Sequence, residues 1–290
     1  MWLYRLTWIV VWVVSFPCYG QVSDIDSILS SASAEIGVAY GVDNETVHSW
    51  NNERDYPMMS VFKVPVAVTA LHKMQLCGTS PDSMITVTAQ QLSANTWSPL
   101  RDRYPQGNVA VSLKELIYYT ISLSDNNTCD ILIDYCGGIG VVRDMALILS
   151  DGKCRISATE QDMHDDIDMC YHNICTPEAM VKMLRNIYSG DIITGEMLDI
   201  FSDSMLATNT GLDKMRAGID GKIRLGHKTG SSDRTISGIK IGDNDAGVVY
   251  LPDGRCCYIV VFVKDSSMTD KENAAAISDI AGCIINSLMK

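Results

Sequence analysis

Strand-like segments lie near both ends of this 290-residue chain, and a long region of helical pattern separates them. Near the N-terminus, IGVAYGV (36–42) and TVHSW (46–50) have the composition of two short strands. Longer strand-like runs at 222–232 and 244–265 precede a closing helix. The sequence therefore predicts an α/β (α+β) fold, in which both chain ends share one antiparallel sheet flanked by helices and packed on a mostly helical middle domain.

The same pattern indicates how the chain is divided into domains. We expect residues 21–56 and 207–290 to form the two parts of an α/β domain, and residues 57–206 to form an all-α domain. The cleft between the two domains is the natural place for an active site. Two helix starts are marked clearly, because a capping box begins at Ser112 and Thr176 precedes a proline in the first turn of another helix.

The first 20 residues have the composition of a secretory signal peptide. They contain one basic residue, Arg5, then an apolar run at 6–16, and then Pro17 and small residues. The run is shorter than the ~20 apolar residues of a membrane-spanning helix, so we expect cleavage after Gly20 and no membrane association afterwards. This predicts a periplasmic or secreted protein, and Cys18 leaves lipoprotein attachment open.

The charge of the mature chain excludes several classes of partner. After cleavage the chain keeps 22 of its 23 basic residues and all 35 acidic ones, which gives a formal net charge of −13. Nucleic acids and anionic membranes require a basic surface, so neither is an expected partner. A small soluble substrate fits better, and we expect a monomer.

The cysteines predict a free thiol but no particular disulfide. Without Cys18, nine of the ten cysteines remain in a chain bound for an oxidising compartment, so at least one is unpaired unless it pairs between molecules. His164, Cys170, His172 and Cys175 are metal-type side chains close together in sequence. They lack a paired C-x-x-C or H-x-x-x-H framework, so we expect no metal and no cofactor.

One serine and one lysine interrupt the apolar stretch YPMMSVFKVPVAV (56–68), where Ser60 precedes Lys63 by three residues. On a helix these side chains share one face, so the amine can reach the hydroxyl, and a serine paired with a base is an activated nucleophile. The alternative is a serine cap followed by a lysine that extends to solvent. A helix that begins at Ser60 would place Pro65 in its second turn, which predicts a kink.

Two further stretches favour the chemical interpretation. Ser-Asp-Asn stands at 124–126 and Lys-Thr-Gly at 228–230. The set S-x-x-K, S-D-N and K-T-G, in this order, is the signature of class A β-lactamases and penicillin-binding proteins. Taken singly, the second element could be a turn and the third an edge strand with a bend. All three arising by chance at these distances is improbable.

Each of these polar side chains has a physical task. Ser124 can relay a proton to the leaving nitrogen, and the amide of Asn126 can bind a substrate carbonyl. Lys228 is a fixed positive charge, while Thr229 and Ser231 supply hydroxyls for a substrate carboxylate.

From about residue 21 to 290, the chain resembles class A serine β-lactamases. TWSPL (96–100) looks like the aromatic-Ser-Pro loop of that family, with Trp97 at the mouth of the cleft. SDNNTCDILI and TEQDMH look most like the extended-spectrum branch that includes the PER, VEB and CfxA enzymes, which favours cephalosporins. The resemblance implies a small-molecule β-lactam substrate, catalytic Ser60, Lys63, Ser124, Glu160 and Lys228, and substrate-binding Trp97, Asn126, Thr229, Gly230 and Ser231.

Glu160 distinguishes hydrolysis from simple acylation. In the resembled family, a loop glutamate activates the water that releases the acyl group from the serine, and TEQDMH stands in the corresponding interval. The alternative is a solvated acid in an acidic loop. Ala158 departs from the family, because many members place an arginine there that ties this loop down. Whether Lys63 or Glu160 is the base for acylation stays open.

Two other functions share the same motifs. A penicillin-binding peptidase would use Ser60, Lys63, Ser124 and Lys228 on cell-wall peptides and would hold the acyl group for long periods. A β-lactam sensor would be acylated once and would signal, and such sensors are normally tethered by membrane helices. Glu160 favours the hydrolase over both. We therefore expect a β-lactamase that hydrolyses penicillins and cephalosporins and confers antibiotic resistance.

Overall fold

The computed structural model describes residues 19–290. The expected signal peptide, including Cys18, lies outside the described residues except for its last two positions. Among the helices of the described part, none combines the length and the apolar character that crossing a membrane requires.

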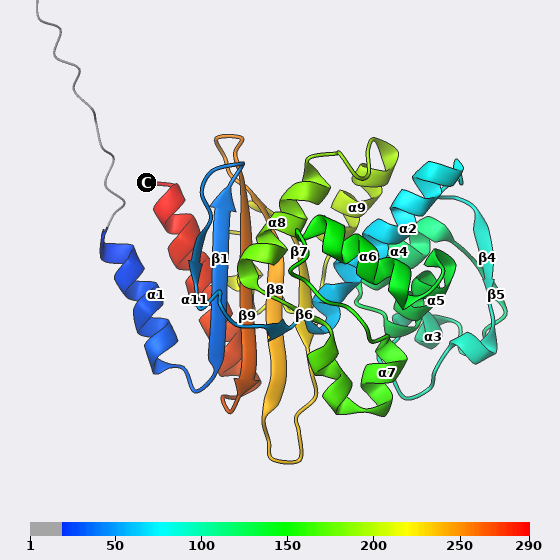
Figure 1. Ribbon diagram of the computed structural model, residues 1–290, viewed down its shortest axis with the longest axis horizontal. Coiled ribbons are helices and arrows are strands. Elements are labelled where there is room, and N and C mark those ends of the chain that lie inside the picture. The colour runs from blue at the N-terminus through cyan, green and yellow to red at the C-terminus, as the bar shows by residue number, and fades with distance from the viewer. Residues whose placement is uncertain (1–18) are drawn as a thin grey trace, which may run out of the picture.

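A five-stranded antiparallel sheet joins the two ends of the chain, as the sequence predicted (Figure 1). Helices α1 (Tyr19–Ser31) and α11 (Asp270–Leu288) cover one face, and the helical region packs against the other face. The predicted fold class is therefore confirmed. In spatial order the strands are β2 (His48–Trp50), β1 (Glu35–Val42), β9 (Cys256–Ser266), β8 (Lys240–Tyr250) and β7 (Arg224–Ser231).

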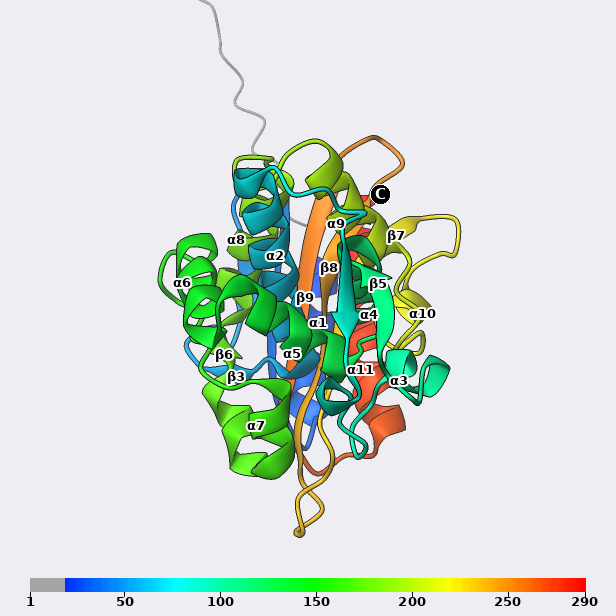
Figure 2. The same ribbon diagram turned by 90° about the vertical axis from the view of Figure 1, so that its right-hand side faces the viewer.

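The helical region surrounds α2 (Lys63–Cys77), whose side chains are buried along most of its length. Figure 2 views the molecule from the side of this region. The other helices of this region are α3 (Pro99–Arg103), α4 (Leu113–Ser122), α5 (Asn126–Cys136), α6 (Ile139–Leu149), α7 (Glu160–Asp165), α8 (Pro177–Tyr188) and α9 (Glu196–Leu206). The short helix α10 (Met215–Gly218) packs against α11 instead. Two small sheets pair β3 (Tyr56–Pro57) with β6 (Ile174–Cys175) and β4 (Met84–Val87) with β5 (Val109–Ser112).

Strand β9 shows how one sheet supports two hydrophobic cores. Val260 and Phe262 pack into the core shared with the helical region, whereas Val261 and Val263 pack into the core beneath α11. Successive side chains of a strand point to opposite faces, so a continuous apolar strand fills both layers. Packing on both faces holds the sheet in place, including its edge strand β7.

Local sequence signals account for several element boundaries. Ser112 begins α4 with the expected capping box, and Thr176 caps α8, which has a proline in its first turn. The expectation for Pro65 was wrong, because residues 59–62 form a 3-10 turn and α2 begins only at Lys63. Pro65 therefore lies in the first turn of α2, where a helix leaves its N–H groups without partners and proline removes no hydrogen bond.

Adjacent side chains on α6 provide a test of the core. Leu149 is fully buried, and Ile148 is 62% exposed. We expect Leu149→Ala to lower the free energy of unfolding by about 2–5 kcal/mol, because it leaves a cavity. Ile148→Ala should change it by about 0.5 kcal/mol or less. Urea unfolding of both variants measures the difference, and equal losses would contradict this description of the core.

Candidate active site

Ser60 lies in the tight turn that precedes α2, beside the edge strand β7. Met59, the residue before it, has a φ of 47°, which is uncommon for a side chain of this size. A Cβ atom added at Gly230 would lie 2.7 Å from the Met58 carbonyl oxygen and 2.9 Å from the Ser60 amide nitrogen. Glycine at this position is therefore what allows β7 to approach the backbone of the serine turn.

Lys63 is completely buried and connects three polar side chains. Its Nζ donates to Ser60 Oγ at 2.8 Å, so the contact expected from their spacing is present. The same amine donates to Asn126 Oδ1 at 2.7 Å and forms an ion pair with Glu160. The side chains of the first motif, the second motif and the acidic loop thus meet at one ammonium group.

A second buried lysine lies on the other side of the cleft. Lys228 Nζ donates to Ser124 Oγ at 2.8 Å and to the Thr229 carbonyl oxygen at 2.7 Å. Burial, and then the positive charge of Lys63, hold the pKa of Lys228 well below its usual range. A lysine in this state can exchange a proton with the hydroxyl that it contacts, so the expectation that Lys228 is a fixed positive charge was wrong. Ser124 itself has a φ of 58°, which turns its side chain towards the cleft.

Asp125, the middle residue of the second motif, positions two loops. Its buried carboxylate caps α5 and accepts hydrogen bonds from Ser98 Oγ at 3.0 Å and from the Leu100 amide at 2.7 Å. This links the loop that carries Trp97 to the Ser124 loop. The Trp97 indole donates to the Leu123 carbonyl oxygen at 2.9 Å, and its side chain remains 60% exposed at the cavity mouth.

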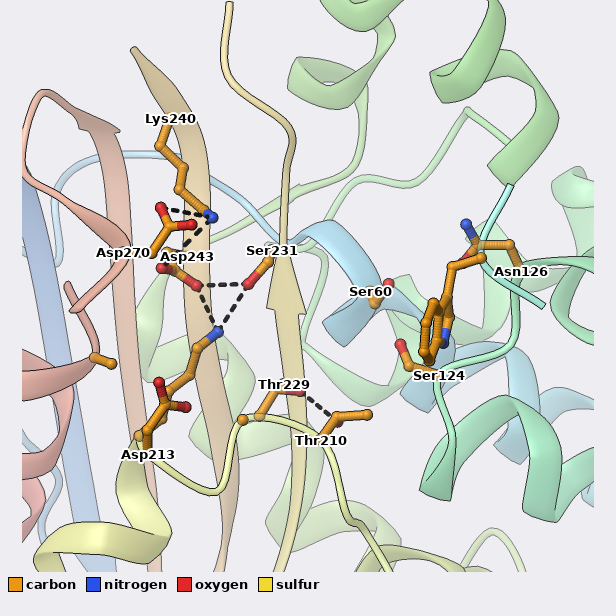
Figure 3. Close-up of a pocket in the computed structure, with 14 residues that line it drawn as sticks. Ser60, Ser124, Asn126, Thr210, Asp213, Thr229, Ser231, Lys240, Asp243 and Asp270 are labelled. Atoms are coloured by element: carbon orange, nitrogen blue, oxygen red, sulfur yellow. Dashed lines mark hydrogen bonds and ion pairs between the residues drawn. The ribbon is translucent and has the colours of Figure 1, made fainter. Parts of the chain in front are cut away.

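A charged network underlies Ser231 at the end of β7 (Figure 3). Ser231 Oγ donates to Asp243 Oδ1 at 2.6 Å, and Lys214 Nζ lies 2.9 Å from Ser231 Oγ and 2.5 Å from Asp243 Oδ1. Thr229 Oγ1 lies 2.7 Å from Thr210 Oγ1. The hydroxyls expected to bind a carboxylate therefore adjoin a buried cation.

Lys214 and Asp243 were not predicted from the sequence as site residues. Asp243 lies directly opposite Ser231 in the pairing of β7 with β8. This register depends on the length and shape of the connection at 232–239, and neither could be predicted from the sequence. Lys214 lies immediately before the short helix α10 and belongs to none of the three motifs.

Backbone contacts fix Glu160 at the start of α7. Asp130 on α5 accepts hydrogen bonds from the Glu160 amide at 2.8 Å and the Gln161 amide at 2.9 Å. The buried Asn173 amide joins the two ends of the loop, since its Oδ1 accepts from the Ala158 amide at 3.0 Å and its Nδ2 donates to the Ala158 carbonyl oxygen at 2.8 Å. These contacts hold the loop where an arginine is absent.

A disulfide joins Cys154 to Cys175, a pairing that the sequence did not single out. The other seven cysteines of residues 19–290 are unpaired, which confirms the expected free thiol. Cys175 is therefore not available as a metal ligand. His227 is a buried residue of β7 and contacts Asp245 Oδ1 through Nδ1 at 2.9 Å.

Two adjoining cavities of about 360 and 450 Å³ open around Ser60. The smaller one reaches Lys214 and Asp243, and the larger one reaches Glu160 and His164. The structure brings the ten site residues expected from the sequence to this region. Seven of them line a cavity, namely Ser60, Trp97, Ser124, Asn126, Glu160, Thr229 and Ser231, whereas Lys63 and Lys228 lie buried behind it and Gly230 is part of β7.

Asp130 predicts a measurable pH dependence of stability. Burial, and then the charge of Glu160, raise the pKa of Asp130 to about 7, whereas an unfolded aspartate titrates near 4. Folding takes up a proton between these values, so this group lowers stability as pH rises from about 4 to about 7. The free energy of unfolding of Asp130→Asn relative to the wild type should therefore rise from pH 5 to pH 7.5.

Urea unfolding at the two pH values measures this change. Asp134→Asn, which alters an exposed aspartate of the same helix, is the matched control. A constant difference between Asp130→Asn and the wild type would contradict the prediction.

Comparison with known proteins identifies the family. The model of the β-lactamase enzyme family matches residues 21–288. A β-lactamase of Bacteroides uniformis is 41% identical over 91% of this chain and 90% of its own length, and β-lactamase VEB-1 of Pseudomonas aeruginosa is 34% identical over 89% and 86%. A class A β-lactamase structure from Bacteroides cellulosilyticus has a TM-score of 0.90, 44% identity, and coverage of 94% of this chain and 98% of that one. The chain therefore belongs to the β-lactamase enzyme family and is a class A member, a hydrolase that acts on β-lactams.

Proposed function

We propose that the protein hydrolyses the β-lactam amide of penicillins and cephalosporins through an acyl-enzyme on Ser60. The observation that carries this proposal is the position of the Lys63 ammonium, which contacts Ser60 Oγ and forms an ion pair with Glu160. A nucleophile and a water-activating carboxylate are thereby held on opposite sides of one cation. This arrangement serves both steps of an acyl transfer to water.

In the first step, Ser60 Oγ attacks the ring carbonyl and loses its proton to the Lys63 amine that it contacts. The carbonyl oxygen becomes negative and accepts hydrogen bonds from the amides of Ser60 and Ser231. Each such donor is worth about 3 kcal/mol. The approach of β7 to the serine turn at Gly230 supports this oxyanion site. Breakage of the C–N bond then opens the ring.

Ser124 completes acylation by protonating the departing nitrogen. Its hydroxyl contacts Lys228, whose lowered pKa suits it to replace the proton that Ser124 gives up. The substrate carboxylate lies against Thr229, Ser231 and the Lys214 ammonium. Asn126 binds the side-chain carbonyl of the substrate. Trp97 covers the opening of the cavity.

In the second step, Glu160 takes a proton from water, which attacks the ester carbonyl and frees Ser60. This step separates a β-lactamase from a penicillin-binding peptidase or a sensor. Three of the sequence neighbours of Glu160, Asp162, Asp165 and Asp166, are exposed, whereas Glu160 is buried against Lys63. This difference in exposure supports a catalytic role for Glu160 and disfavours the alternative that it is a solvated acid.

We further propose that the mature enzyme is exported as a monomer to the periplasm or the medium and protects the cell from β-lactams. The leader at 1–20 and the Cys154–Cys175 disulfide support export to an oxidising compartment. The acidic surface supports a soluble enzyme that does not bind nucleic acid or anionic membranes after cleavage.

Glu160→Gln tests the mechanism. With a chromogenic cephalosporin in large excess, the wild type should show linear turnover. Glu160→Gln should release about one equivalent of chromophore and then stop, because Ser60 is acylated and not regenerated. Ser60→Ala should show neither phase.

Asp165→Asn is the matched control, since it removes one negative charge from an exposed position of α7. It should keep wild-type turnover. Undiminished steady-state hydrolysis by Glu160→Gln would remove Glu160 from the mechanism. A single burst by the wild type itself would favour the peptidase or sensor.

A further inference from the structure

We propose that the Cys154–Cys175 disulfide positions Glu160 for deacylation, so that breaking this bond slows release of the acyl group and leaves acylation of Ser60 intact. The inference rests on the deacylating role proposed above for Glu160. We refer to residues 155–174, which lie between the two cysteines, as the Glu160 loop.

The disulfide closes the Glu160 loop at its base. The Cα atoms of Cys154 and Cys175 lie 4.3 Å apart, although 21 positions separate them in sequence. Immediately inside the bond, Arg155 and Ile174 exchange backbone hydrogen bonds of 2.8 and 2.9 Å. Asn173 then bonds the backbone of Ala158, two residues before Glu160. The covalent bond is thus the outermost of three successive ties across the base.

The same base is attached to the turn that carries Ser60. Cys175 pairs with Tyr56 where β6 meets β3, and the Met58 amide donates to the Asn173 carbonyl oxygen at 2.8 Å. In Figure 2, β3 and β6 lie directly above α7. The disulfide therefore ties the incoming end of the loop, at Cys154, to a strand that is hydrogen-bonded to the segment just before the nucleophile.

Beyond the base, Met163 and Cys170 pack into the core, and polar contacts hold the residues around Glu160. Asp130 accepts from the amides of Glu160 and Gln161, and Lys63 pairs with the Glu160 carboxylate. Like charges in the same short segment repel one another at low ionic strength. The exposed acids of the loop are Asp162, Asp165, Asp166 and Asp168.

Acylation does not depend on the base of the loop in the same way. Ser60 and Lys63 both belong to the buried turn that leads into α2, and they contact one another directly. Glu160 must instead hold water against the ester carbonyl, and a displacement of about 1 Å can cost about 100-fold in rate. A loosened loop therefore impairs the second step more than the first.

The chemical step that opens the loop is thiol–disulfide exchange with a dithiol reductant. The reductant donates two electrons, the S–S bond breaks, and Cys154 and Cys175 become thiols while the reductant forms its own disulfide. An oxidising compartment keeps the bond closed. The enzyme is then fully competent in turnover only after oxidation.

The double variant Cys154→Ala/Cys175→Ala tests the proposal. Enzyme is acylated with a penicillin, excess substrate is removed, and loss of the acyl mass is followed by mass spectrometry. We expect the acyl-enzyme half-life to lengthen about 10-fold or more. For a substrate whose turnover is limited by deacylation, we also expect kcat and KM to fall together, so that kcat/KM is unchanged. A loss of folded enzyme would instead lower kcat and leave KM constant. Cys136→Ala, which truncates a buried unpaired cysteine, is the matched control and should behave as the wild type.

Each result decides the proposal. A wild-type half-life in the double variant, or a lower kcat at constant KM, would overturn it. If the double variant does not fold, wild type reduced briefly with a dithiol and then desalted is measured in the same way. An unchanged half-life there also rejects the role of the disulfide. Normal turnover by Glu160→Gln would instead reject the proposed mechanism, so the two failures are distinguishable.

Discussion

The charge of Lys63 has no access to water, and the arrangement of the active site depends on how that charge is compensated. Burial of an unpaired ammonium costs several kcal/mol, so the fold must supply a counter-ion and hydrogen-bond acceptors. Glu160 supplies the charge, while Ser60 and Asn126 supply the acceptors. These three groups come from separate segments of the chain. Compensation of one lysine therefore forces the catalytic groups into contact.

A second buried lysine, Lys228, adds a further electrostatic constraint. Lys228 lies close enough to Lys63 for that charge to help lower its pKa. Two ammonium groups that share a cavity disfavour one another, and the one without a carboxylate partner loses its proton more readily. Lys63 forms an ion pair with Glu160, whereas no carboxylate within residues 19–290 forms one with Lys228, which donates to the Ser124 hydroxyl and a carbonyl oxygen. The lowered pKa suits Lys228 to exchange a proton through Ser124.

Structural features that depend on local sequence pattern or on the three motifs could be predicted from the sequence. The sheet built from both ends followed from strand-like runs, and the start of α4 followed from the capping box at Ser112. Asp243 and Lys214 could not be predicted, because their contact with Ser231 depends on strand register across a hairpin of unknown shape. The Cys154–Cys175 pairing could not be predicted for a related reason, because nine cysteines allow many pairings and only the path of the folded chain selects one.

The two steps of the proposed reaction are supported by different parts of the structure. The nucleophile belongs to a turn at the centre of the buried core, which cannot move without disturbing the packing around α2. Glu160 belongs to a loop that packs on that core through Met163 and Cys170. Polar contacts hold Glu160 itself, and a covalent bond closes the base of the loop. A chain that lost the loop geometry would keep a reactive serine and would behave as a penicillin-binding protein does. In the proposed mechanism, hydrolysis is thus added to acylation by the contacts that keep the Glu160 carboxylate against Lys63.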